Sequence, residues 1–141
     1  MGKFFSVKEL TYSATARKYG IDNTPDEESV VNMEELIEVL DGVRKEWGSA
    51  LLVLSGFRCG ELNEKLGGVK TSAHKIGYAV DLVPANNQKM KFFEFMKEYL
   101  KDKPFDELIL ETNSNGGVWI HFALKSIQGK QRRKIKMLEV K

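Results

Sequence analysis

The sequence has little cysteine and no long apolar run, and both deficits restrict what the protein can be. Cys59 is the only cysteine among 141 residues, so no internal disulfide can form and stability cannot depend on an oxidising compartment. No stretch reaches the roughly 20 apolar residues that a membrane-spanning helix needs, so we do not expect membrane insertion. The formal net charge of only +2 gives no reason to expect a nucleic-acid partner.

The N-terminus has no long apolar segment either, so the sequence predicts no secretory signal. We therefore expect a protein that is synthesised in the cytoplasm without a signal peptide. The length favours a single domain over residues 1–141, and we expect a monomer. A domain of this size buries enough surface to form a hydrophobic core without covalent staples.

The first third of the chain carries the clearest helix signals. Ser6 and Glu9 match a capping box, which predicts a short helix that ends near Gly20. Thr24 is placed to cap a second helix, with Pro25 at its first position. The apolar positions of this second helix recur at helical spacing: Met33, Leu36, Ile37, Leu40, Val43 and Trp47.

Short apolar or alternating runs follow and predict strands. The turn at 113–117 is rich in residues that tolerate positive φ, so it predicts a hairpin. Along the strand after this turn, period two places Trp119 and His121 on one face. Helices followed by strands indicate an α+β fold, with a mostly antiparallel sheet flanked by helices. The expected strands are 50–54, 78–83, 107–111 and 118–124, with a helix at about 88–100 between the second and third.

The chain ends in a basic segment, about residues 129–141. The ordinary interpretation of such a segment is a solvated edge or a loosely held terminus. The functional alternative is attraction to an anionic surface, such as a cell-wall polymer or nucleic acid.

Two histidines and one aspartate are the residues best suited to hold a metal ion. His74 precedes Asp81 by seven residues, and His121 lies far downstream. Two imidazoles and one carboxylate are the usual protein ligands of a catalytic zinc site, with a fourth position left for water. Asp81 lies in an apolar segment, where an unpaired carboxylate would be costly, and Gly77 lets the chain bend before it. The alternative is that both histidines simply form hydrogen bonds within the fold and that the aspartate is an ordinary surface residue. This alternative stays open because the spacing is not the helical His-Glu-x-x-His pattern.

A set of short motifs runs through the chain between about residues 4 and 125. In chain order these motifs are Ser55-Gly56-Phe57-Arg58, Leu62-Asn63, Gly67-Gly68, Ser72-x-His74-x-x-Gly77-x-Ala79-x-Asp81, Phe105-Asp106-x-Leu108-Ile109-x-Glu111 and Trp119-Ile120-His121. Together they resemble the zinc D-alanyl-D-alanine carboxypeptidase family, peptidoglycan-cleaving metallopeptidases that are related in fold to the Hedgehog signalling domain. The N-terminal segments Phe5-Ser6-x-x-Glu9-Leu10 and Ile21-Asp22-Asn23-Thr24-Pro25 resemble the small phage- or prophage-encoded branch of this family.

The resemblance implies that His74, Asp81 and His121 bind Zn²⁺. It also implies a general base that takes a proton from water and later passes it to the leaving amine. Glu111 is the candidate for this base, and Asp106 is the alternative. Some relatives place the base in a Glu-x-x-His arrangement, but the residue three before His121 is Val118.

The resemblance also suggests roles for residues around the metal ligands. Arg58 is expected to stabilise the developing oxyanion or hold the substrate; the alternative is a salt bridge that pins its turn. Ser72 is expected to bind the substrate or to cap the loop before the first histidine. Trp119 either forms a wall of the site or belongs to the core. We do not expect Cys59 to bind the metal.

The expected function is therefore hydrolysis of a peptide bond in the peptidoglycan stem peptide. Both D-Ala-D-Ala carboxypeptidase and L-Ala-D-Glu endopeptidase specificities occur among relatives. The alternative is a non-catalytic zinc module of the same fold with a structural or binding role. As an enzyme, the protein would act on the cell wall after its release or as part of a phage particle, such as an endolysin or a virion-associated hydrolase.

Overall fold

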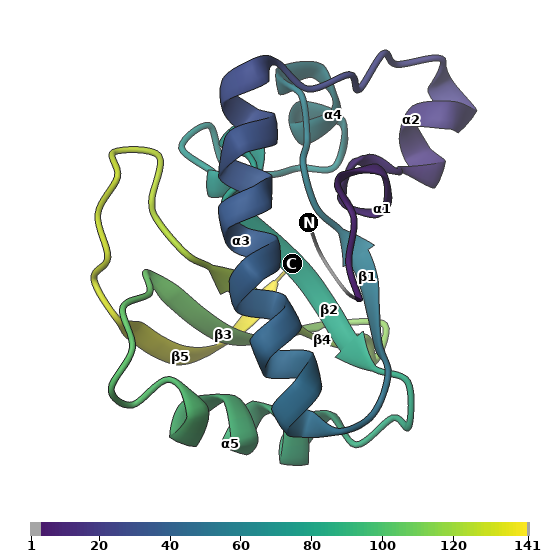
Figure 1. Ribbon diagram of the computed structural model, residues 1–141. Helices are drawn as coiled ribbons and strands as arrows, with labels where there is room; N and C mark the ends of the chain where they lie inside the picture. Colours follow the sequence, from purple (N-terminus) through teal and green to yellow (C-terminus); the bar gives the residue numbers. More distant parts are fainter. Residues whose placement is uncertain (1–3, 141) are drawn as a thin grey trace.

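The computed structural model describes residues 4–140 and has eleven helices and strands in these residues (Figure 1). No helix in this range is long and apolar enough to span a membrane. In chain order the elements are α1 (Val7–Thr11), α2 (Ala14–Tyr19), α3 (Glu27–Trp47), β1 (Leu51–Ser55), α4 (Gly60–Lys65), the 3₁₀ helix η1 (Ala73–Ile76), β2 (Ala79–Pro84), α5 (Lys89–Tyr99), β3 (Glu107–Asn113), β4 (Val118–Ala123) and β5 (Lys134–Val140).

The five strands form one sheet in the order β1-β2-β4-β3-β5. Neighbouring strands are antiparallel except β3 and β5, which are parallel. Helices α3 and α5 lie together over one face of this sheet (Figure 1). The prediction of an α+β fold with a mostly antiparallel sheet flanked by helices is therefore confirmed.

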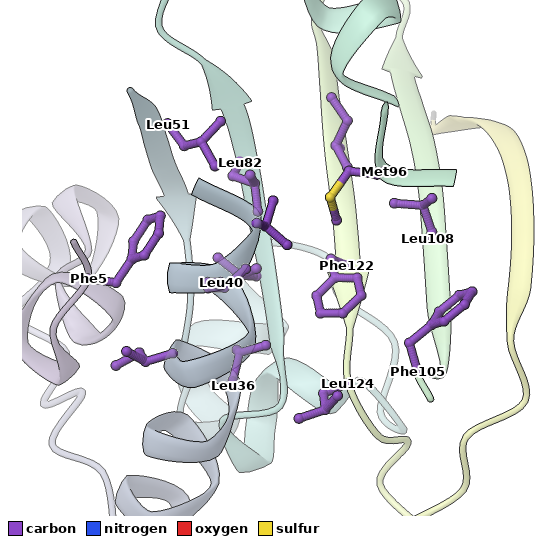
Figure 2. Close-up of a cluster of buried hydrophobic side chains, with 14 of the residues drawn as sticks. Phe5, Leu36, Leu40, Leu51, Leu82, Met96, Phe105, Leu108, Phe122 and Leu124 are labelled. Carbon is purple, nitrogen blue, oxygen red and sulfur yellow. The ribbon is translucent and has the colours of Figure 1, made fainter. Parts of the chain in front are cut away.

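The main core lies between α3, α5 and the covered face of the sheet. Leu36 and Leu40 of α3 point toward Leu82 of β2 and Phe122 of β4, and all four side chains are fully buried (Figure 2). Full burial of a leucine or phenylalanine side chain contributes about 1.5–3 kcal/mol. Because α3 covers the middle of the sheet on this side, polar side chains of β2, β3 and β4 gather on the other side.

The N-terminal helices differ in detail from the prediction. The expected single helix is two, since Tyr12 adopts an extended conformation and Ser13 caps a new helix through the backbone N–H of Ala16. Helix α3 is capped by Asp26, whose carboxylate accepts the N–H of Ser29 at 2.8 Å, so the predicted Thr24 cap is wrong. The Thr24 side chain instead donates to the carboxylate of Asp22, because this short turn brings the two side chains together.

The basic C-terminal segment ends in a solvent-exposed edge of the sheet, which is one of the two ordinary interpretations given above. Its last part is strand β5 and not a loosely held terminus, because β3 offers an open edge to which it pairs in parallel register from Glu107↔Lys134 to Asn113↔Val140. Lysines on an exposed edge strand discourage further strand addition. Residue 141 lies outside the described residues.

Candidate metal centre

The two predicted histidines and Asp81 lie together on the sheet face that α3 does not cover. Asp81 of β2 and His121 of β4 are direct cross-strand partners, and His74 in η1 lies against them. These three residues line a groove of about 480 Å³. Tertiary structure has therefore brought together ligand candidates that are separated by up to 47 positions in the chain (121 − 74).

Local backbone chemistry places His74 at this point. The Ser72 hydroxyl caps η1 by accepting the N–H of His74 at 3.2 Å. Gly77 ends η1 with φ of 83°, a left-handed conformation that favours glycine. A Cβ on Gly77 would lie only 2.6 Å from the carbonyl oxygen of Ser29. The sharp bend between His74 and Asp81 therefore requires glycine.

The donor atoms of the three residues have the spacing that a metal ion needs. His74 Nε2 lies 3.3 Å from Asp81 Oδ1, and His121 Nδ1 lies 3.1 Å from the same oxygen. One donor atom from each residue falls within 4.8 Å of the others. Ligands bound about 2.0–2.1 Å from a tetrahedral zinc ion are roughly 3.3–3.4 Å apart. The observed separations fit this geometry.

The hydrogen bond made by the His74 ring leaves an electron pair directed at Asp81. His74 Nδ1 lies 2.7 Å from the carbonyl oxygen of Gly56, which can only accept, so Nδ1 carries the hydrogen. Burial lowers the pKa of His74, which favours the neutral ring, and a neutral ring presents the lone pair of Nε2 to Asp81 Oδ1. Two acceptors at 3.3 Å repel each other unless a cation lies between them. The arrangement is that of a cation site.

Electrostatics favour a cation at this place. Burial alone would raise the pKa of Asp81, but the flanking histidines His74 and His121 hold it well below its usual value, so the carboxylate is charged. Burial lowers the pKa of His121, but hydrogen bonds to Asp81 and Glu107 outweigh this effect and raise it to about 10. The negative field that favours a proton on His121 also favours a divalent cation.

Arg58 holds Asp81 from the opposite side. Its Nη2 lies 3.2 Å from Asp81 Oδ2, while Nε donates to Ser55 Oγ and Nη1 to Asn63 Oδ1. A guanidinium has five N–H donors, so these three contacts leave two hydrogens for a ligand in the groove, which Arg58 lines. Burial lowers the pKa of Arg58. Arg58 therefore forms the salt bridge considered as its structural alternative, and it also lines the groove.

The turn that carries Arg58 is fixed by the buried Asn23, whose role was not predicted from the sequence. The amide group of Asn23 donates to the carbonyls of Thr11 and Phe57, and its oxygen accepts the N–H of Cys59. The Cys59 sulfur caps α4 and does not belong to the metal cluster found among residues 4–140. A polar residue in a turn gives no sequence signal for such a long-range role.

Glu111 lies in the same groove, on β3. Its Oε1 accepts a hydrogen bond of 2.6 Å from the indole N–H of Trp119, its cross-strand partner. Burial is the main reason that the pKa of Glu111 is raised.

The predicted alternation along β4 is confirmed: Trp119 and His121 lie on one face of the strand, and both line the groove.

The alternative base, Asp106, is held by another partner. Its side chain is only 1% exposed, and Arg132 donates to both of its oxygens, at 2.7 Å from Nε and 2.8 Å from Nη2. Glu107 is a further residue of this groove that was not predicted from the sequence, and its Oε1 lies 3.3 Å from His121 Nε2. The alternation of Glu107 and Glu111 along β3 was the signal that would have found it.

A mixed α+β domain with this donor set and a half-buried glutamate in one groove has the features of a metallopeptidase. The family model described as peptidase M15 matches residues 3–123, and the chain belongs to this family of zinc D-Ala-D-Ala carboxypeptidase-type enzymes. No curated protein matches the sequence.

Proposed function

We propose that the protein is a zinc peptidase that hydrolyses one peptide bond in the stem peptide of peptidoglycan. One observation carries this proposal. The donor atoms of His74, Asp81 and His121 converge in a groove that also contains Glu111 and Arg58, all within the part of the chain that the peptidase family matches. Bound zinc supplies Lewis-acid chemistry there, since it polarises a carbonyl and makes water more acidic.

Glu111 acts as the general base and then as the general acid. Trp119 occupies its Oε1, and no partner for Oε2 is present among residues 4–140, so Oε2 takes the proton from the attacking water. The raised pKa of Glu111 makes the carboxylate a better base. The same proton then passes to the nitrogen of the leaving amine. Asp106 is excluded from this role in the proposal because Arg132 occupies both of its oxygens.

Arg58 stabilises negative charge on the substrate. Its two unused N–H groups fit either the oxygen of the polarised carbonyl or a carboxylate of the substrate. The contact with Asp81 fixes the orientation of the Arg58 guanidinium. The side chain therefore loses little rotamer freedom when substrate binds.

The groove runs from the loop before η1, across β4 and β3, to β5. We propose that Ser72 and Trp119 contact the stem peptide, which lies between these two walls. Arg58 and Lys136 both line the groove and supply positive charge for a substrate rich in carboxylates. Either the D-Ala-D-Ala bond or the L-Ala-D-Glu bond of such a peptide fits this description.

The biological setting follows from the substrate and from the resemblance to the small phage branch. We propose a phage or prophage cell-wall hydrolase with the Hedgehog/DD-peptidase fold, acting as a monomer of one domain. It would reach the wall after release from the cell or as part of a virion.

The test is cleavage of purified sacculi and of defined stem peptides by the zinc-loaded protein, with Glu111→Gln as the matched variant. Loss of a general base lowers the rate by about 10²–10⁴-fold, while zinc binding by Glu111→Gln should stay intact. Mass spectrometry of the products identifies the bond, because cleavage after L-Ala and cleavage between the terminal D-Ala residues give different fragments. If wild type and variant bind zinc but are equally inactive, the non-catalytic zinc module is the correct interpretation.

A further inference from the structure

Each imidazole of the metal centre uses one nitrogen to face Asp81 and the other to contact a group outside the donor set. For His74 this group is the Gly56 carbonyl. For His121 it is the carboxylate of Glu107, with Oε1 at 3.3 Å from Nε2. A carboxylate that is ionised can only accept, so this contact keeps a hydrogen on Nε2 and leaves Nδ1 to bind a metal.

Glu107 is in turn held by the C-terminal segment. Arg132 Nη2 lies 3.6 Å from Glu107 Oε2 and 2.8 Å from Asp106 Oδ2. One guanidinium therefore forms ion pairs with two neighbouring carboxylates. The Arg132 side chain is 40% exposed while the Asp106 side chain is 1% exposed. The arginine therefore reaches inward from the surface and fixes the start of β3.

The backbone of this segment is anchored at the same point. The N–H of Arg132 donates to Asp106 Oδ1 at 3.1 Å, and the N–H of Lys134 donates to the backbone carbonyl of Asp106 at 2.8 Å. The Arg132 side chain thus projects from a backbone with little freedom to move. All of these contacts come from residues beyond position 123, where the family match ends.

We propose that Glu107, held by Arg132, is a positioning residue that fixes the orientation and tautomer of His121 for metal binding. The C-terminal segment is then part of the metal centre, and not only an added edge of the sheet. Outer partners of ligating histidines typically change metal affinity by about 10–100-fold when they are removed. The proposal rests on the metal site of the proposed function.

Zinc affinity, measured by competition with a chromogenic chelator, tests this proposal on the full chain. Glu107→Ala should weaken zinc binding by about 10–100-fold. Glu107→Gln keeps an acceptor oxygen and the size of the side chain, so it should fold like the wild type and lose less affinity. Arg132→Ala should also lose affinity, and Arg132→Lys should recover part of it. The matched control is Arg133→Ala, because the Arg133 guanidinium donates to carbonyls of the turn that follows α5 and lies over the Phe105 ring, away from the metal ligands.

A second readout reports the tautomer directly. The sequence has only two histidines, so ¹⁵N spectra of the zinc-loaded protein with labelled histidine are simple to assign. We expect the hydrogen on Nε2 of His121 and on Nδ1 of His74. A hydrogen on Nδ1 of His121, or a Glu107→Ala variant with wild-type zinc affinity, would overturn the proposal.

These outcomes separate the positioning role from the proposed function. If the wild type binds zinc and cleaves stem peptides while Glu107→Ala binds zinc equally well, only the positioning role is refuted. If the wild type binds no zinc, the proposed function and the positioning role both fail.

Discussion

Replacing Arg132 by alanine in the metal-free protein tests how strongly β5 is fastened to the rest of the fold. The substitution removes two charged hydrogen bonds from a carboxylate that is 1% exposed, and Asp106 keeps only the backbone N–H of residue 132. Breaking a buried ion pair costs about 3–5 kcal/mol, but the Arg132 side chain is 40% exposed. We therefore expect a loss of roughly 2–3 kcal/mol and a fall in Tm of about 5–10 °C.

This loss should depend on pH with a definite sign. Burial alone would raise the pKa of Asp106, but hydrogen bonds from the side chain and backbone of Arg132 hold it below its usual value. A depressed carboxyl pKa stabilises the fold above the unfolded pKa of about 3.9, and this contribution disappears as the pH falls through the native pKa. In Arg132→Ala the pKa of the buried Asp106 rises, so protonation stabilises the variant. The difference in unfolding free energy is therefore largest near pH 7 and shrinks as the pH falls, first through the raised pKa of Asp106 in the variant and then through its depressed pKa in the wild type.

Urea unfolding followed by circular dichroism, at a series of pH values from 7 to 3 and with a chelator present, measures this difference. Arg133→Ala is the control, because its side chain donates to backbone carbonyls only, including those of Leu100 and Lys101. Its effect on stability should be independent of pH over the same range. A difference between wild type and Arg132→Ala that stays constant with pH would refute the assignment of the lost stability to the Asp106 pair.

Three further predictions concern the groove and its supports. Arg58→Lys keeps the charge but loses the planar guanidinium that contacts Asp81 and the substrate at the same time. In a stem-peptide assay kcat/KM should therefore fall by about 10²-fold. Gly77→Val should destabilise the protein by about 1–3 kcal/mol in urea unfolding, because its Cβ would lie 2.6 Å from the Ser29 carbonyl oxygen at φ of 83°. Lys136→Glu should raise KM for an acidic stem peptide with little change in kcat.

Each of these predictions has an outcome that would contradict it. Full activity of Arg58→Lys would show that the fork geometry is not used. Unchanged stability of Gly77→Val would mean that η1 can shift without cost. An unchanged KM in Lys136→Glu would place the substrate away from β5; Lys130→Glu, in the loop before that strand, is the matched charge control.

The metal ligands were accessible from the sequence because their chemistry is rare in this chain. With only two histidines, any site of two imidazoles and a carboxylate has to use both, and an aspartate inside an apolar strand needs a partner. Period two along β4 placed Trp119 with His121, because alternation is a property of the strand alone. Glu107 could have been found from its alternation with Glu111 along β3. Asn23 could not, because it acts through partners that are 12, 34 and 36 positions away, and no local sequence pattern predicts such contacts.

The sequence by itself therefore determined most of the helices and strands and the side chains that can bind a metal, since periodicity and side-chain chemistry are local properties. Tertiary structure alone decided that the basic tail becomes a strand, since pairing depends on an open edge of β3 that only the folded sheet provides. It also decided that Arg132 forms ion pairs with Asp106 and Glu107, next to the metal centre. Contacts between distant parts of the chain depend on how the sheet is assembled, and assembly is a property of the whole fold.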